Sequence, residues 1–141
     1  MVRTIRHKIR ISSEIAATPD VIWERISDHD ATPTWVDEVT RVTLSREGSP
    51  RNGRGAIRVV EFAPRLWSTI HEGVTLFEPG RAFEYVLFKG MPSLRSHLGR
   101  LSIAAQAGRG CIRTSTNSKF SSNLKVVSAL QLSPNGGADY E

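Results

Sequence analysis

The segment spanning residues 15–39 constrains the fold most, because two proline-marked helix starts follow directly after a long alternating strand. Thr18-Pro19 and Thr32-Pro33 each match an N-cap residue followed by proline at the first helical position, where a missing N–H costs no hydrogen bond. The apolar residues that recur at helical spacing between them are Val21, Ile22, Trp23 and Ile26. The sequence therefore predicts a strand, two short helices and then further strands, which is an α+β order.

The rest of the chain consists of apolar-rich segments separated by turn residues, a pattern typical of an antiparallel meander. In the first strand, predicted over residues 4–16, isoleucines recur on one face and His7 and Ser13 share that face. The further strands are predicted over residues 39–45, 56–62, 66–77, 81–88, 95–105 and 111–119. Seven strands with one apolar face need a cover, so we expect another element to pack against the sheet.

The composition is that of a soluble globular protein and indicates a single domain over residues 1–141, with 39% hydrophobic and 23% charged residues. No apolar run approaches the roughly 20 residues that span a bilayer, so no membrane insertion is expected. The first residues are basic and lack an apolar signal-peptide core. One cysteine, Cys111, excludes an internal disulfide and fits a reducing compartment, so we expect a cytoplasmic protein.

The chain has a formal net charge of +5, and basic residues gather in two groups along it. The first is the alternating set Arg6, Lys8 and Arg10, and the second is the set Arg51, Arg54 and Arg58 beside a Gly-rich turn. Neither group contains the interleaved aromatic residues of a nucleic-acid platform, so no nucleic acid is expected as partner. We interpret both groups as solvated charged faces, with a docking surface for acidic partners as the alternative.

The order of short motifs resembles the START-like, or SRPBCC, helix-grip superfamily, and within it the polyketide cyclase/dehydrase-like group. The residues that carry this resemblance are Ile15, Ala17, Pro19, Ile22-Trp23, Ser27-Asp28, Trp35, Gly53-x-Gly55, Glu78-Pro79, Tyr85, His97-x-Gly99-Arg100-Leu101 and Gly110-x-Ile112. They span about residues 9 to 120. The resemblance implies a strongly curved seven-stranded antiparallel sheet with two short helices after strand one, a C-terminal helix across the sheet, and a ligand cavity between them.

The C-terminal segment, residues 121–141, departs from this pattern. The family has an amphipathic helix of about 20 residues here, whereas the helical part of this segment can hardly exceed Asn123–Leu132, roughly 15 Å at the helical rise. Leu124, Val127 and Leu130 could face the sheet, but so short a helix covers little of it. We expect either an open cavity or cover by a second copy, and favour a homodimer.

Aromatic and polar strand residues are the candidates for the cavity wall. The predicted ligand-binding residues are Trp35, Phe62, Trp67, Tyr85, Phe88 and Leu101. The candidates for acid–base chemistry are Tyr85, His71 and His97. Strand parity puts His71 and Glu72 on opposite faces, and likewise Glu84 and Tyr85, so any dyad has to form across strands. For each of these residues, a place in the core or on the solvent face is the competing interpretation.

No cofactor or metal is expected. Asp28-His29-Asp30 lacks supporting ligands at helical spacing, and Asp28 is expected to end the first helix and bond to the loop backbone. The chain has no P-loop, dinucleotide fingerprint or Ser-His-Asp arrangement. We therefore predict a protein that binds a small hydrophobic molecule, such as a lipid, a polyketide or an aromatic metabolite. A cyclase/dehydrase-like enzyme and a protein-interaction module that uses the basic face are the alternatives.

Overall fold

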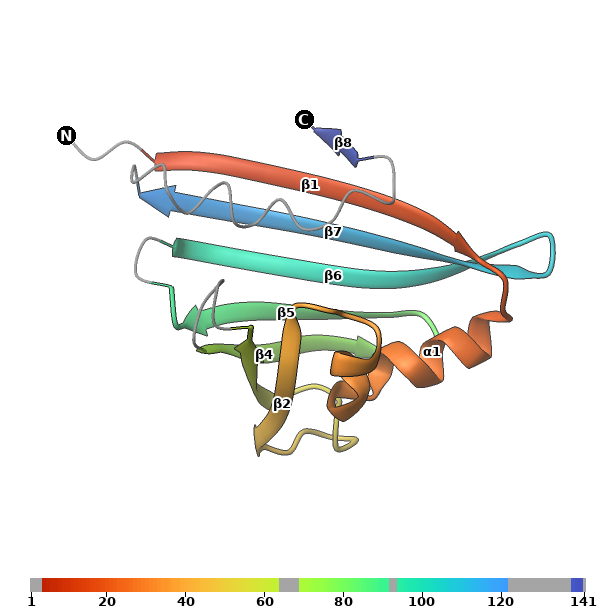
Figure 1. Ribbon diagram of the computed structural model, residues 1–141, viewed down its shortest axis with the longest axis horizontal. Helices are drawn as coiled ribbons and strands as arrows, with labels where there is room; N and C mark the ends of the chain where they lie inside the picture. The colour runs from red at the N-terminus through yellow and green to blue at the C-terminus, as the bar shows by residue number, and fades with distance from the viewer. Residues whose placement is uncertain (1–3, 64–68, 92–93, 122–137, 141) are drawn as a thin grey trace.

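The computed structural model describes residues 4–63, 69–91, 94–121 and 138–140, and these form one curved antiparallel sheet with two short helices (Figure 1). The strands are β1 (Thr4–Ile15), β2 (Val39–Arg46), β3 (Ile57–Phe62), β4 (Thr69–Glu78), β5 (Ala82–Lys89), β6 (Leu94–Gln106), β7 (Arg109–Ser121) and β8 (Ala138–Tyr140). Their order in the sheet is β2-β3-β4-β5-β6-β7-β1-β8. The seven predicted strands are confirmed, and β8 adds an unpredicted eighth strand on the edge of β1.

The first helix, α1 (Pro19–Ser27), begins after Thr18, as predicted. The second is a 3-10 helix, η1 (His29–Thr34), and the prediction that Thr32 caps it was wrong. Asp28 caps η1 because its carboxylate accepts the N–H of Asp30 at 3.2 Å, whereas the Thr32 hydroxyl donates to the carbonyl oxygen of His29. Asp28 therefore ends α1 and starts η1, as an Asx residue that bonds to its own loop.

The helix α1 packs on what we call the inner face of the sheet. Its Ile22 and Ile26 form a buried cluster with Phe83 and Leu101. Gly110 on β7 makes this close approach possible, since a Cβ atom at that position would lie 2.1 Å from Cδ1 of Ile22. A second buried cluster lies at the other edge of the inner face and contains Val39, Val42, Val60, Ile70 and Met91. Together they define the core.

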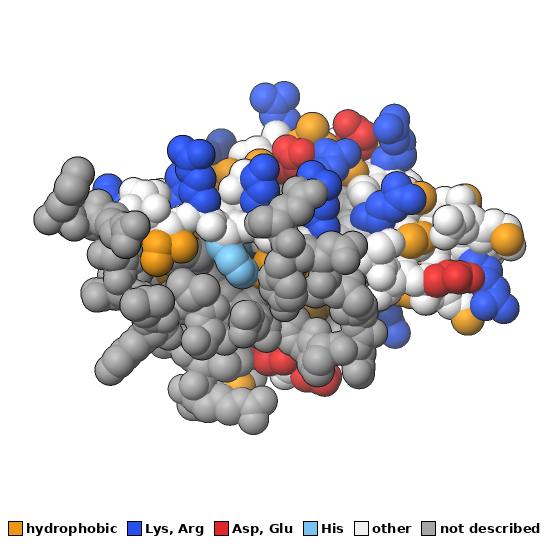
Figure 2. Space-filling model, turned by 90° about the horizontal axis from the view of Figure 1, so that it is seen from above, with side chains coloured by type: hydrophobic (Ala, Val, Ile, Leu, Met, Phe, Trp, Pro, Cys, Tyr) orange, Lys and Arg blue, Asp and Glu red, His pale blue; other side chains and the backbone are white. Residues whose placement is uncertain are grey.

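The opposite, outer face of the sheet is open to solvent along β1. Burial alternates residue by residue in this strand, with Ile5, Ile9 and Ile11 turned inward and Arg6, Lys8 and Arg10 exposed. The predicted parity of β1 is therefore confirmed. Seen from the β1 edge, Lys and Arg side chains gather along one side of the molecule (Figure 2).

Two further predictions concern a C-terminal helix that covers the sheet and the absence of a membrane-spanning segment. The short helix predicted over Asn123–Leu132 lies outside the described residues. In the part of the chain that the structure describes, no helix has the length and apolar character needed to cross a membrane.

Candidate functional site

One polar residue from each of four successive strands points to the inner face. These residues are Arg58 on β3, Glu72 on β4, Tyr85 on β5 and His97 on β6. The strand register makes them neighbours, because Arg58 pairs with Glu72, and Tyr85 pairs with Gly99 two residues from His97. The apolar residues Leu101, Ile103 and Ile112 continue the same face. The inner face is thus an apolar surface with a polar row at one end.

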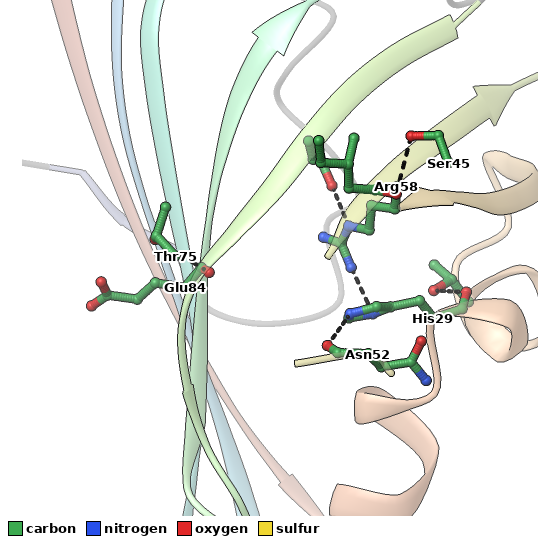
Figure 3. A network of polar contacts seen from close by, with 9 residues as sticks. His29, Ser45, Asn52, Arg58, Thr75 and Glu84 are labelled. Carbon is green, nitrogen blue, oxygen red and sulfur yellow. Dashed lines mark hydrogen bonds and ion pairs between the residues drawn. The ribbon is translucent and has the colours of Figure 1, made fainter. Parts of the chain in front are cut away.

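Arg58 is the centre of a buried hydrogen-bond network (Figure 3). Its Nε donates to Glu72 Oε2 at 2.6 Å, and its Nη1 donates to Nδ1 of His29 at 3.0 Å. The other ring nitrogen of His29, Nε2, donates to the carbonyl oxygen of Asn52 at 2.9 Å. Because a guanidinium can only donate, Nδ1 of His29 must be the acceptor and Nε2 carries the proton. The network therefore fixes the tautomer of His29.

His29 is held in its neutral form by this environment. Its side chain is fully buried, and burial together with the neighbouring Arg58 lowers its pKa from 6.5 to about 3. The charges of Asp30 and Arg51 act on this pKa more weakly and in opposite directions. Arg58 itself forms a salt bridge with Glu72, and the two side chains are only 10% and 8% exposed. The network links η1 to β3 and β4 and supports the site.

Tyr85 lies flat across β6 because its cross-strand partner is glycine. A Cβ atom on Gly99 would lie 2.1 Å from Cζ of Tyr85 and 2.4 Å from its hydroxyl oxygen. The guanidinium carbon of Arg58 lies 4.7 Å from the Tyr85 ring centroid, a cation–π distance. Burial, and then the negative charge of Glu72, raise the pKa of Tyr85, so its hydroxyl keeps its proton and can donate a hydrogen bond.

His97 is the neighbour of Tyr85 on the inner face, with 6.0 Å between the two ring centroids. Its Nδ1 and the hydroxyl oxygen of Ser118 on β7 are 2.6 Å apart. Burial lowers the pKa of His97, against an opposing effect of Glu72. A neutral imidazole beside a protonated phenol gives this end of the inner face two uncharged hydrogen-bonding groups.

Three of the predicted site residues lie together on the inner face, namely Tyr85, His97 and Leu101. Phe62 packs instead against the cluster around Val39. Trp35 follows η1 and is 39% exposed, while Trp67 lies outside the described residues.

His71 and Phe88 lie on the outer face, which corrects their predicted place in the cavity. Glu72 points inward, so the adjacent His71 points outward, where its ring lies 6.0 Å from that of Phe88. The Phe88 side chain is 56% exposed. The prediction that His71 and Glu72 lie on opposite faces is confirmed. The same prediction for Glu84 and Tyr85 is also confirmed, because Glu84 points away from the Arg58 network (Figure 3).

Arg58 and His29 are the site residues that the sequence did not identify. Arg58 was expected on a solvated face with Arg51 and Arg54, and this was wrong, because Arg58 is only 8% exposed. Arg58 shares a face of β3 with the apolar Val60, but Ile57 and Val59 make the other face apolar too, so the pattern did not show which face is buried. No signal in the sequence joins His29 to residues so far along the chain. Among the described residues, no group of three His, Cys, Asp or Glu is placed to hold a metal ion.

Together, the curved sheet, the helix on its inner face and the polar row define a START-like domain. Residues 6–136 match the family model described as polyketide cyclase / dehydrase and lipid transport, and the chain belongs to this family. The suspected family is thereby confirmed. None of the curated proteins matches the chain.

Solved structures with low sequence identity share the fold. Norcoclaurine synthase from Thalictrum flavum is 17% identical, with a TM-score of 0.70 over 91% of this chain and 78% of the other. A START superfamily protein from Mycobacterium smegmatis is 16% identical, with a TM-score of 0.68 over 79% and 76% of the two chains. The protein XoxI from Bacillus cereus is 18% identical, with a TM-score of 0.70 over 89% and 83%. At such identities these similarities establish the fold alone.

Proposed function

We propose that the protein binds a small, largely apolar molecule against the inner face of the sheet. The observation that supports this most is the uncharged pair of hydrogen-bonding side chains, Tyr85 and His97, at the end of an otherwise apolar surface. Ligand sites commonly combine an apolar wall with a few polar groups that fix orientation. The family description, which includes lipid transport, fits this proposal.

The pair also suggests which part of a ligand it would hold. Tyr85 would donate to an oxygen of the ligand, and in the tautomer whose Nδ1–H donates to Ser118, Nε2 of His97 would accept from a ligand hydroxyl. Arg58 is already engaged by Glu72 and His29, so it offers little charge for a ligand anion. A neutral molecule with one hydroxyl or carbonyl group, of lipid, polyketide or aromatic type, satisfies these groups best.

Native mass spectrometry of the freshly purified protein tests this, because it reports a retained small molecule and the oligomeric state together. The variant Thr116→Trp fills the inner face between Gly99 and Ile9, to which Thr116 is paired. The control Arg113→Trp adds the same bulk to an exposed position on the same strand. We expect a bound molecule in wild type and control, and its loss in Thr116→Trp.

A wild-type protein that retains no ligand and takes up no neutral apolar molecule offered to it would refute the binding function. Equal loss in Thr116→Trp and Arg113→Trp would refute the inner face as the site. The same spectra determine whether the protein is a homodimer, which we propose as the second part of this function.

The second candidate is a cyclase/dehydrase-like enzyme that uses the same pair of residues. His97 is neutral and can accept a proton, and Tyr85 stays protonated and can polarise a carbonyl. Turnover should then be lost in His97→Gln, while the ligand of the wild-type protein is still retained. A binding protein without catalysis would show no turnover in either form. Interaction through the basic β1 face stays a prediction, tested by reversing the charges of Arg6, Lys8 and Arg10.

A further inference from the structure

A hollow of about 460 Å³ lies at the end of the sheet where β5 and β6 separate. The pairing of these strands ends at Val86 and Leu98, and their remaining residues, 87–89 and 94–97, are not paired with each other. Figure 1 shows the two strands diverging at this end. Val86, Leu98 and Asn117, which line the hollow, are paired with one another on the face opposite to Tyr85 and Gly99, so we infer that the hollow opens on the outer face. His97 is the one residue that it shares with the inner-face site.

One wall of the hollow is apolar and open to solvent. It is formed by Val86, Phe88 and Leu98, of which Phe88 is 56% and Leu98 40% exposed. These are two of only four large hydrophobic residues that are exposed in the described part of the chain. Adjacent exposed apolar side chains of this size are typical of a binding surface.

The other wall is basic. Arg95 and Lys119 line the hollow, both are exposed, and neither forms an ion pair with a described residue. Arg100, on the same face nearby, behaves differently because its Nη1 lies 2.7 Å from Glu84 Oε1. Arg6 is the β1 residue paired with Lys119, so it adds a third cation beside the hollow. Among the described residues that line the hollow there is no Asp or Glu, so their net charge is positive.

We propose that this hollow binds an amphiphilic anion, a single molecule with an apolar chain or ring and a carboxylate or phosphate head. The apolar part lies against Val86, Phe88 and Leu98, and the head lies between Arg95 and Lys119, with the amide of Asn117 as a further donor. The volume is that of a small-molecule site, which favours a free molecule over a flat membrane surface or a protein. The proposal does not rest on the inner-face function.

The test is an NMR titration of the ¹⁵N-labelled protein with dodecanoate below its micelle concentration, with dodecanol as the uncharged probe. Dodecanoate should shift the amides of Val86, Leu98 and Asn117, and dodecanol should bind there more weakly. The double variant Arg95→Glu, Lys119→Glu should weaken dodecanoate binding by about tenfold or more. The matched control Arg46→Glu, Arg54→Glu changes the net charge equally at two other exposed positions and should bind as wild type.

Phe88→Ser gives an independent test of the apolar wall at a side chain that is mostly exposed, so folding is retained. It should also weaken dodecanoate binding, whereas Thr116→Trp on the inner face should not. The proposal is overturned if both double variants lose affinity equally, or if the shifts fall on inner-face residues. It is also overturned if dodecanoate causes no shift and only phosphatidylglycerol vesicles bind.

Discussion

The buried salt bridge between Arg58 and Glu72 allows the sharpest test of the site, because the chain contains an exposed counterpart. In both pairs an Arg Nε contacts a Glu Oε2 across adjacent strands. The side chains of Arg58 and Glu72 are 10% and 8% exposed, and those of Arg41 and Glu61 are 71% and 33% exposed. The two pairs therefore differ mainly in burial.

Replacing Arg58 by Met should lower the free energy of unfolding by about 3–5 kcal/mol, because a buried carboxylate loses its partner. The double variant Arg58→Met, Glu72→Leu removes that unpaired charge and should recover part of the loss. A remaining cost of about 1–3 kcal/mol is expected, since Nδ1 of His29 has lost its donor. The control Arg41→Met removes an exposed pair and should cost less than about 1 kcal/mol.

Urea unfolding followed by tryptophan fluorescence gives these free energies. The argument fails if Arg58→Met costs no more than Arg41→Met, or if adding Glu72→Leu makes the Arg58 variant still less stable. Either result would mean that burial does not dominate the energetics of this pair.

Three further predictions follow from single contacts. The pKa of His29 is lowered from 6.5 to about 3, so below pH 6.5 the unfolded chain binds a proton that the folded protein does not, and the free energy of unfolding falls toward pH 3. His29→Gln should make this decrease with pH less steep, as measured by urea midpoints at a series of pH values. An equally steep decrease in the variant would contradict the prediction. Gly110→Ala should cost about 1–3 kcal/mol in unfolding free energy, because its Cβ would meet Cδ1 of Ile22 at 2.1 Å; Ile22→Val removes that atom and should restore part of the loss. Gly99→Ala should displace the Tyr85 ring and reduce ligand retention in native mass spectra, with retention at the wild-type level as the contrary outcome.

The features of the fold that could be predicted from the sequence depend on patterns among residues close together in the chain. The alternation of exposed and half-buried residues along β1 follows from its isoleucines, and the start of α1 follows from Thr18-Pro19. Both signals act between residues that are close in the chain. The same holds for the opposite faces of His71 and Glu72. The order of short motifs along the chain was enough to identify the family.

The tertiary structure decided what depends on contacts between distant residues. The direction of Arg58 could not be predicted, because β3 carries apolar residues on both faces and only its register with Glu72 shows which is buried. His29 enters the network across 29 residues of sequence, a contact that no local spacing records. The hollow likewise exists because the pairing of β5 with β6 stops at Val86 and Leu98. Sequence periodicity fixes which residues share a face, but only strand register and curvature determine which of those residues meet.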